Sequence, residues 1–247
     1  MKYALVNGAR QEPEPKLQGA CPNCEKEMIA KCGQKRIWHW AHRGKLECDR
    51  WWEPETEWHR AWKSLFPKEW QEVIHKADDG ERHIADVKNS NGLVIELQHS
   101  HISPEERLSR ESFYENMVWV VDGMRLKRDL AAFRKAVDFS ARERDAQNQL
   151  LLVPTADRAE ILRCWSPIRC SVFLDFGDEE FSIGGIQLPP VLWRLYLLRG
   201  SGRVAFSPVT RANFLQFALN GTALQPALRM PPPPPRGRYR AGTTRRF

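Results

Sequence analysis

The sequence predicts a mixed α/β (α+β) fold that follows a small metal-binding module. Two segments of strand character, residues 82–88 and 93–98, flank a connection that ends in Asn-Gly, a strong signal for a hairpin. The segment Ser103-Pro-Glu-Glu106 is a helix-capping signature and predicts that a helix follows the hairpin. A Cys-x2-Cys pair and a later His-x2-His pair lie within the first 50 residues, at spacings typical of zinc ligands.

The length of 247 residues allows one large domain or two small ones, and a hydrophobic fraction of 42% is enough for a core. No apolar run is long enough to cross a membrane, and the N-terminus lacks the apolar stretch of a secretory signal. We therefore expect a cytoplasmic protein without membrane attachment, whose cysteines are thiols or metal ligands. The expected parts are a zinc-binding module (1–50), a core (51–150), an α+β region of unknown role (151–225) and a disordered Pro/Arg-rich tail (226–247).

The net charge of +7 suggests a polyanionic partner, but most of this charge lies in the tail. Residues 226–247 carry six arginines and no acidic residue, so the rest of the chain is close to neutral. Arg236, Arg238 and Arg240 follow a run of prolines, which favours an extended segment that holds nucleic acid in a salt-sensitive way. A tail that only improves solubility explains the same composition equally well.

Five residues compete for the four places of a zinc site in the first module: Cys21, Cys24, His39, His42 and Cys48. Cys21 and Cys24 form a knuckle that presents two thiolates to one ion, and His42 is the third expected ligand. The fourth is His39 or Cys48; alternation along a strand sends His39 and His42 to opposite sides, which keeps Cys48 in the set. We expect a structural site, because a module this small buries little apolar surface. A cluster of buried thiols without metal is the alternative.

The hairpin brings two acidic residues together. Asp86 lies a few residues before the turn and Glu96 a few after it, so antiparallel pairing makes them neighbours, with Gln98 on the same face as Glu96. Adjacent carboxylates repel each other unless a cation lies between them. A divalent ion that takes oxygen ligands, Mg²⁺ or Mn²⁺, fits this pattern. The alternative is a hairpin whose acidic face is simply hydrated.

A helix with Pro54 in its first turn is expected before the hairpin. Its apolar stripe consists of Trp58, Trp62, Leu65 and Phe66. Glu55, His59 and Lys63 recur every four residues along one flank of this stripe, whereas Glu57 points away. The helical wheel thus selects Glu55 as the acid that reaches the hairpin. An ordinary polar helix flank is the alternative for these residues.

The helix that begins at Ser103 carries Arg107, Arg110 and Tyr114 at helical spacing, which predicts a cationic face suited to a phosphate backbone. An apolar run at 117–121 predicts a buried central strand. The other expected elements are strands at 70–75, 170–176 and 180–186 and helices at 125–148, 190–198 and 209–219. The C-terminal half shows no catalytic constellation, and we expect it to shape a substrate groove or to contact a protein partner.

An aspartate followed by a strand that ends in Glu-x-Gln resembles the PD-(D/E)xK nuclease core, with Gln98 where that family usually has lysine. Further motifs, in the same order, resemble the CoiA-like competence family: Arg82-x-x-x-Asp-Val, Ile-Glu-Leu-Gln-His-Ser100, Ile-Ser-Pro-Glu-Glu-Arg, the spacing from Arg110 to Tyr114, and Val118-Trp-Val-Val. The Cys-Pro-x-Cys and His-aromatic-Ala-His stretch is similar to the zinc-binding piece of that family. The resemblance covers about the first half of the chain.

This resemblance implies a restriction-endonuclease-like core and a metal-dependent DNA nuclease. The site residues that it implies are Asp86, Glu96, Gln98, Glu55, His59 and Lys63. Asp86 and Glu96, joined by Glu55, are expected to hold one or two Mg²⁺ or Mn²⁺ ions. Gln98 orients a water but offers no positive charge, so we expect Lys63 or Lys88 to supply it.

DNA contacts are expected from Arg82, Ser100, Arg110 and Tyr114, and the choice between single- and double-stranded DNA stays open. Two rival functions remain. One is a catalytically inactive, nuclease-derived DNA-binding or recombination-accessory protein, which the glutamine at position 98 favours. The other is a zinc-finger adaptor whose hairpin acids are incidental.

Overall fold

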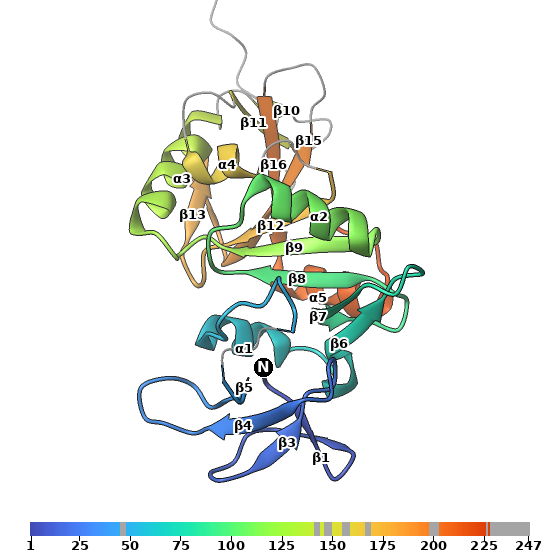
Figure 1. Ribbon diagram of the computed structural model, residues 1–247. Coiled ribbons are helices and arrows are strands. Elements are labelled where there is room, and N and C mark those ends of the chain that lie inside the picture. Colours follow the sequence, from blue (N-terminus) through green and yellow to red (C-terminus); the bar gives the residue numbers. More distant parts are fainter. Residues whose placement is uncertain are drawn as a thin grey trace, which may run out of the picture.

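The computed structural model describes residues 1–44, 48–140, 144–145, 150–154, 159–165, 169–197, 203–225 and 227. In Figure 1 a small N-terminal sheet lies below a larger sheet, and helices cover both faces of the larger one. None of the helices in this part of the chain is long and apolar enough to span a membrane.

The small sheet is antiparallel throughout, with the strand order β2-β1-β3-β4-β5. Its strands are β1 (Ala4–Val6), β2 (Ala9–Gln11), β3 (Gln18–Ala20), β4 (Glu27–Lys31) and β5 (His39–His42). Its core consists of Met1, Ala4, Cys21, Met28 and Trp40. A core of this size stabilises a sheet only weakly, which fits a module that a metal ion helps to hold together.

The larger sheet has the strand order β10-β11-β16-β15-β12-β9-β8-β7-β6. Its strands are β6 (Gln71–Lys76), β7 (Arg82–Lys88), β8 (Val94–Gln98), β9 (Met117–Asp122), β10 (Arg144–Asp145), β11 (Leu150–Pro154), β12 (Ser171–Asp175), β15 (Val191–Leu197) and β16 (Arg203–Thr210). Strands β8, β9 and β12 are parallel, and the remaining neighbours are antiparallel. Every residue of β9 is buried, which confirms the predicted central strand.

Helices protect the two faces of this sheet. The helices are α1 (Glu57–Lys63), α2 (Pro104–Tyr114), α3 (Lys127–Ser140), α4 (Glu160–Cys164) and α5 (Arg211–Asn220), with a short 3₁₀ helix, η1 (Lys68–Trp70). α1 and α5 contribute Trp62 and Phe214 to the core on one face, while α2 and α3 contribute Tyr114 and Phe133 on the other. Ser103 caps α2 by accepting the Glu106 amide at 3.1 Å, as the capping signature predicts.

The turn between β7 and β8 confirms the predicted hairpin. Asn89 Oδ1 accepts hydrogen bonds from the backbone amides of Asn91 and Leu93, both at 2.9 Å. Gly92 has a φ of +80°, a left-handed conformation that glycine adopts at little steric cost. Asn89 Nδ2 also donates to the carbonyl of Ala218 in α5 at 2.8 Å, which fixes the turn to the C-terminal half.

Three expected elements differ from the structure. Residues 191–197, expected in a helix, form strand β15 between β12 and β16, because a short apolar run without clear periodicity suits either element. The single strand expected at 180–186 is a hairpin of β13 (Phe181–Ile183) and β14 (Ile186–Leu188), with Gly184 and Gly185 at positive φ in its turn. Helix α1 begins at Glu57, after the cap residue Thr56, so Pro54 precedes it.

The C-terminal strands continue the sheet of the hairpin. β12 pairs with β9, so a boundary at residue 150 runs through one continuous sheet. Asp175, at the end of β12, also holds α1 in place: its Oδ2 accepts the indole N–H groups of Trp58 at 3.0 Å and Trp62 at 2.8 Å. Arg211 of α5 donates to Oδ1 of the same carboxylate at 2.8 Å. The position of α1 over the hairpin therefore depends on residues from the second half of the chain.

Candidate functional site

Four of the five candidate zinc ligands converge in the N-terminal module. Cys21, Cys24, His42 and Cys48 offer ligand atoms that all lie within 4.8 Å of one another. The sulfurs of Cys21 and Cys48 are 3.7 Å apart, and Cys24 Sγ lies 3.2 Å from His42 Nε2. A tetrahedral ion with Zn–S bonds of about 2.3 Å separates two sulfurs by about 3.8 Å. The donor set and its spacing therefore fit a metal such as zinc.

His39 is not part of this cluster, so Cys48 takes the fourth place. His39 and His42 are three residues apart in β5 and point to opposite sides, and His39 Nδ1 donates to the carbonyl of Ile37 at 2.9 Å. Burial raises the pKa of the Cys21 thiol, and burial together with the neighbouring thiol of Cys21 raises the pKa of Cys48 to about 12. Thiolates at these positions need a strong positive charge nearby, which a bound metal supplies.

A second cluster lies where three strands of the larger sheet run side by side. The registers Gln71↔Val87 and Val73↔Ala85 place Glu72 level with Asp86, and Val87↔Ile95 places Asp86 beside Glu96. Three carboxylates thus form a row across β6, β7 and β8. Glu72 is the member that the sequence analysis missed; only the register of β6 against β7 identifies it.

The sheet opens between β7 and β8 at the acidic pair. The backbone pairing of β7 with β8 consists of Lys88↔Val94 and Val87↔Ile95. Beyond Val87↔Ile95, the carboxylates of Asp86 and Glu96 accept the backbone N–H groups. Asp86 N donates to Glu96 Oε1 at 3.3 Å, and Leu97 N donates to Asp86 Oδ2 at 3.0 Å. The two carboxylates therefore replace backbone acceptors and are fixed in orientation, which confirms that the hairpin makes them neighbours.

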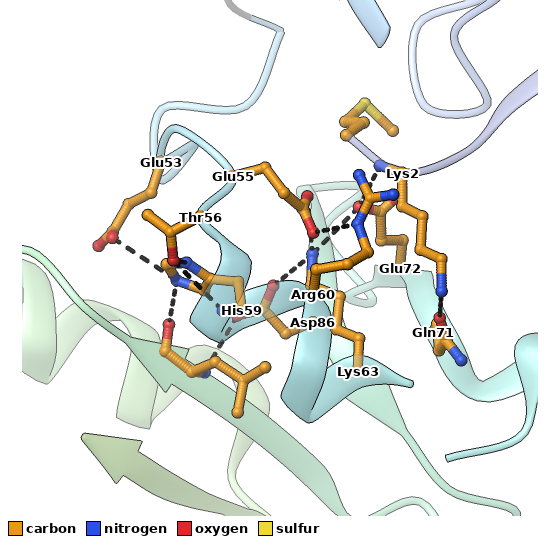
Figure 2. Close-up of polar contacts among 12 residues, drawn as sticks. Lys2, Glu53, Glu55, Thr56, His59, Arg60, Lys63, Gln71, Glu72 and Asp86 are labelled. Carbon is orange, nitrogen blue, oxygen red and sulfur yellow. Dashed lines mark hydrogen bonds and ion pairs between the residues drawn. The ribbon is translucent and has the colours of Figure 1, made fainter. Parts of the chain in front are cut away.

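Lys63 lies at the centre of the acidic cluster (Figure 2). Its Nζ is 3.2 Å from Glu55 Oε2, 3.1 Å from Glu72 Oε1 and 3.1 Å from Asp86 Oδ1. Burial alone would lower the pKa of Lys63, but the three carboxylates outweigh it and raise this pKa well above its ordinary value. Glu55 reaches Lys63 from the segment before α1, so it lies in the cluster although it is not helical, and the helical wheel does not apply to it.

Glu96 is buried, with an exposed fraction of 2%, and pairs with Arg110 of α2. Arg110 Nη1 donates to Glu96 Oε2 at 3.0 Å, while its Nη2 donates to the Trp51 carbonyl at 2.8 Å. Burial and the Asp86 carboxylate raise the pKa of Glu96 to about 8, although Arg110 opposes the shift. The structure corrects the expectation of a cationic face on α2: Arg110 is an internal counter-ion, and Tyr114 is buried as well.

His59 lines the acidic site, whereas Gln98 lies in the wall of a neighbouring pocket with His99 and Asp122. Gln98 Nε2 donates to a carboxylate oxygen of Glu53 and, at 3.1 Å, to the carbonyl of Ser100. Its Oε1 is buried and has no hydrogen-bond partner in the described part of the chain. His59 Nε2 donates to the Leu97 carbonyl at 3.0 Å, and burial lowers the pKa of His59, so the ring is held in its neutral form.

The remaining predicted residues lie farther from this cluster. Arg82 is exposed at the start of β7, and Ser100 is exposed beyond the end of β8. Lys88 Nζ lies 2.9 Å from His75 Nδ1, so Lys63, and not Lys88, accompanies the acidic pair. Arg236, Arg238 and Arg240 lie outside the described residues, as does nearly all of the predicted tail.

One pocket of about 60 Å³ joins these groups. The carboxylates that line it belong to Asp49, Glu53, Glu55, Glu72, Asp86 and Glu96, and its cationic residues are Lys63 and Arg110. Trp52, with an exposed fraction of 43%, lies in the wall of this pocket and also in that of a second pocket, which His42 and Cys48 of the candidate metal cluster line. The pocket is therefore strongly acidic, and it adjoins the N-terminal module.

Comparison with known proteins bears on that module. No curated protein and no solved structure matches the chain. Residues 15–50 match a family model described as the N-terminal domain of competence protein CoiA. The matched segment contains Cys21, Cys24, His42 and Cys48. Over its N-terminal module the chain is thus similar to the CoiA competence protein family.

Proposed function

We propose that this protein is a metal-dependent nuclease that hydrolyses phosphodiester bonds of DNA. The CoiA match supports a competence-related role, and competence involves the processing of DNA. The acidic pocket is the proposed catalytic site. The zinc cluster is a separate, structural centre in this proposal, because its four ligands are all protein groups.

The observation that carries this proposal is the pair of buried Glu96 and partly exposed Asp86, held side by side where the sheet opens. Two adjacent carboxylates, one of them buried, are stable in their charged form only if enough positive charge is close by. Lys63 and Arg110 each pair with one member, yet the pKa of Glu96 is still raised to about 8 by burial and by Asp86. The site therefore lacks positive charge at neutral pH, which a divalent cation would supply.

The donor set fits Mg²⁺ or Mn²⁺. Each carboxylate oxygen has two lone pairs, and the contacts with Lys63, Arg110 and the backbone leave lone pairs on Asp86 and Glu96. Oxygen ligands are those that these ions prefer. A bound ion would polarise the scissile phosphate and lower the pKa of the attacking water.

The other residues of the pocket have roles that follow from their contacts. Lys63 orients Asp86 and Glu55 and keeps a positive charge beside the reacting phosphate, in place of the lysine that Gln98 replaces. Gln98 lies in the wall of a neighbouring pocket, where its unpartnered Oε1 is an acceptor for a water. His59 is neutral and bonded at both ring nitrogens, so it positions the strand end at Leu97 and does not transfer protons.

A cleavage assay tests this proposal. Purified protein is incubated with linear and circular, single- and double-stranded DNA in the presence of Mg²⁺ or Mn²⁺, beside Asp86→Asn and Glu96→Gln. Asp78→Asn is the matched control, because Asp78 is an exposed carboxylate in the turn before β7. We expect cleavage by the wild type and by the control that is lost in both site variants. Cleavage that survives in both site variants would show that the activity belongs to another site or to a contaminant.

A second candidate is a nuclease-derived protein that binds DNA without cutting it. The pairing of Asp86 with Lys63 and the neutral Gln98 favour it, because a site whose acids are already neutralised attracts a metal less strongly. Wild-type protein that shifts DNA in a gel but never cleaves it, with either metal, would support this candidate over the nuclease.

A further inference from the structure

The loop between β4 and β5 carries a basic surface on the N-terminal module. Lys31, Lys35 and Arg36 are exposed along it, and Trp38 follows with an exposed fraction of 46%. From Met28 to Gly44 the chain contains no acidic residue. Figure 1 shows this loop projecting from the sheet, below α1. We call this group of residues the loop platform: Lys31, Lys35, Arg36 and Trp38.

The positive charges of the loop platform are not neutralised within the described chain. No carboxylate there forms an ion pair with Lys31, Lys35 or Arg36. Arg43, in the same module, differs: its Nη1 lies 3.0 Å from Glu27 Oε2. Since the body of the protein is close to neutral, a group of unpaired basic residues indicates a surface for an anionic partner.

Trp38 connects the loop platform to the acidic pocket. Its carbonyl accepts a hydrogen bond from Arg60 Nη2 of α1 at 2.9 Å, and Arg60 Nε lies 3.3 Å from Glu55 in the pocket wall. Trp52, which is 43% exposed, lies in the pocket wall itself. The two exposed indoles thus relate to the pocket differently: Trp52 lines it, whereas Trp38 is connected to it through Arg60 and Glu55.

We propose that the loop platform, together with Trp52, binds a single strand of DNA and leads it to the acidic pocket. Basic side chains that follow the backbone and aromatic rings that stack on bases are the features of single-strand binding surfaces. A duplex keeps its bases stacked on one another, so its bases cannot stack on an indole. This proposal rests on the proposed function for the choice of DNA as ligand and for the role of the pocket. It adds the form of DNA that the protein binds.

Binding is measured by fluorescence anisotropy with a labelled oligothymidylate of about 20 nucleotides, longer than the site of one small domain. No divalent cation is added, so cleavage plays no part. Trp38→Ala is expected to weaken binding about 5- to 100-fold, the range found when one stacking side chain is removed. Trp38→Phe keeps an aromatic ring and is expected to retain most of the affinity. Leu65→Ala, at a residue that is also 46% exposed, is the control and is expected to bind like wild type.

The basic residues are tested through the salt dependence of binding. Each phosphate contact with a single strand contributes about 0.7 to the slope of log K against log salt concentration. The double variant Lys35→Gln, Arg36→Gln is expected to lower this slope by roughly 1.4. Arg43→Gln is the matched control and should change the slope less, because Arg43 is already paired with Glu27. The zinc content of each variant confirms that the module is folded.

Three results would overturn this inference: a duplex bound as tightly as the single strand, an oligouridylate of the same length bound more tightly than the oligothymidylate, or Trp38→Ala with unchanged affinity. These outcomes are separate from the fate of the proposed function. If binding depends on Trp38 but no DNA is cleaved, the proposed nuclease activity is refuted and the proposed binding surface is supported. If DNA is cleaved but Trp38→Ala binds it like wild type, the proposed binding surface is refuted and the proposed nuclease activity is supported.

Discussion

Replacing Lys63 with methionine removes the charge at the centre of the acidic cluster but keeps most of the side-chain volume. Glu55, Glu72 and Asp86 then lose the ammonium group that lies 3.1 to 3.2 Å from each of them. Lys63 is buried, with an exposed fraction of 4%, so water cannot take its place without opening the structure. A buried carboxylate without a counter-ion is strongly destabilising.

The pKa of Glu72 shows the direction of this effect. Burial alone would raise it, but Lys63 is the strongest of the groups that lower it, and the net pKa is about 2 instead of 4.5. The N-terminal ammonium and the backbone amides of Lys2 and Tyr3 share in this shift, so the size of the loss is taken from buried ion pairs in general, where removal of one partner costs about 3 to 5 kcal/mol. Because this pKa is depressed, the contribution is complete above about pH 4.5 and is lost as the pH falls toward 2.

Urea unfolding, followed by tryptophan fluorescence and by circular dichroism, measures the loss. We expect Lys63→Met to lower the free energy of unfolding by about 3 kcal/mol at pH 7, and by less than about half of that at pH 3. Lys68→Met, at an exposed lysine of η1, is the control and should change it by less than about 0.5 kcal/mol. A loss of less than about 1 kcal/mol in Lys63→Met at pH 7 would refute the view that Lys63 neutralises the cluster.

Further predictions concern the zinc cluster, Glu96 and Asp175. Cys48→Ser is expected to abolish stoichiometric zinc binding, whereas His39→Ala should retain it. Mass spectrometry measures the zinc content of the two variants. Equal loss of zinc in both would contradict the set of ligands. The pKa of Glu96 is raised from 4.5 to about 8, first by burial, so stability should fall as the pH rises through this interval. Glu96→Gln should remove that fall in a pH series of urea midpoints, and an unchanged slope would count against the buried acid. Asp175→Asn is expected to cost about 1.5 to 3 kcal/mol, because two indole N–H groups and an arginine lose a charged acceptor. Asp178→Asn, at an exposed carboxylate near the same arginine, should cost less than about 0.5 kcal/mol, and similar losses in the two variants would refute the role of Asp175.

The sequence by itself determined the features that depend on a few neighbouring residues. The hairpin follows from the turn chemistry of Asn89 and Gly92, and the start of α2 follows from Ser103. The zinc knuckle follows from the spacing of Cys21 and Cys24. Turn, cap and knuckle geometries are local, so their residue types can be recognised without knowledge of the fold. The proximity of Asp86 and Glu96 belongs to the same class, because one short turn connects them.

The tertiary structure decided what depends on contacts between distant segments. Glu72 joins the site because β6 pairs with β7 in one register, and Arg110 turns inward because a buried carboxylate lies beneath α2. Strand β15 is a strand because β12 and β16 lie on both sides of it, although its apolar run suits a helix equally well. Asp175 orients α1 from more than a hundred residues away. Long-range pairing and buried charge compensation leave no periodic signal in a single chain, and for that physical reason they are visible only in the folded molecule.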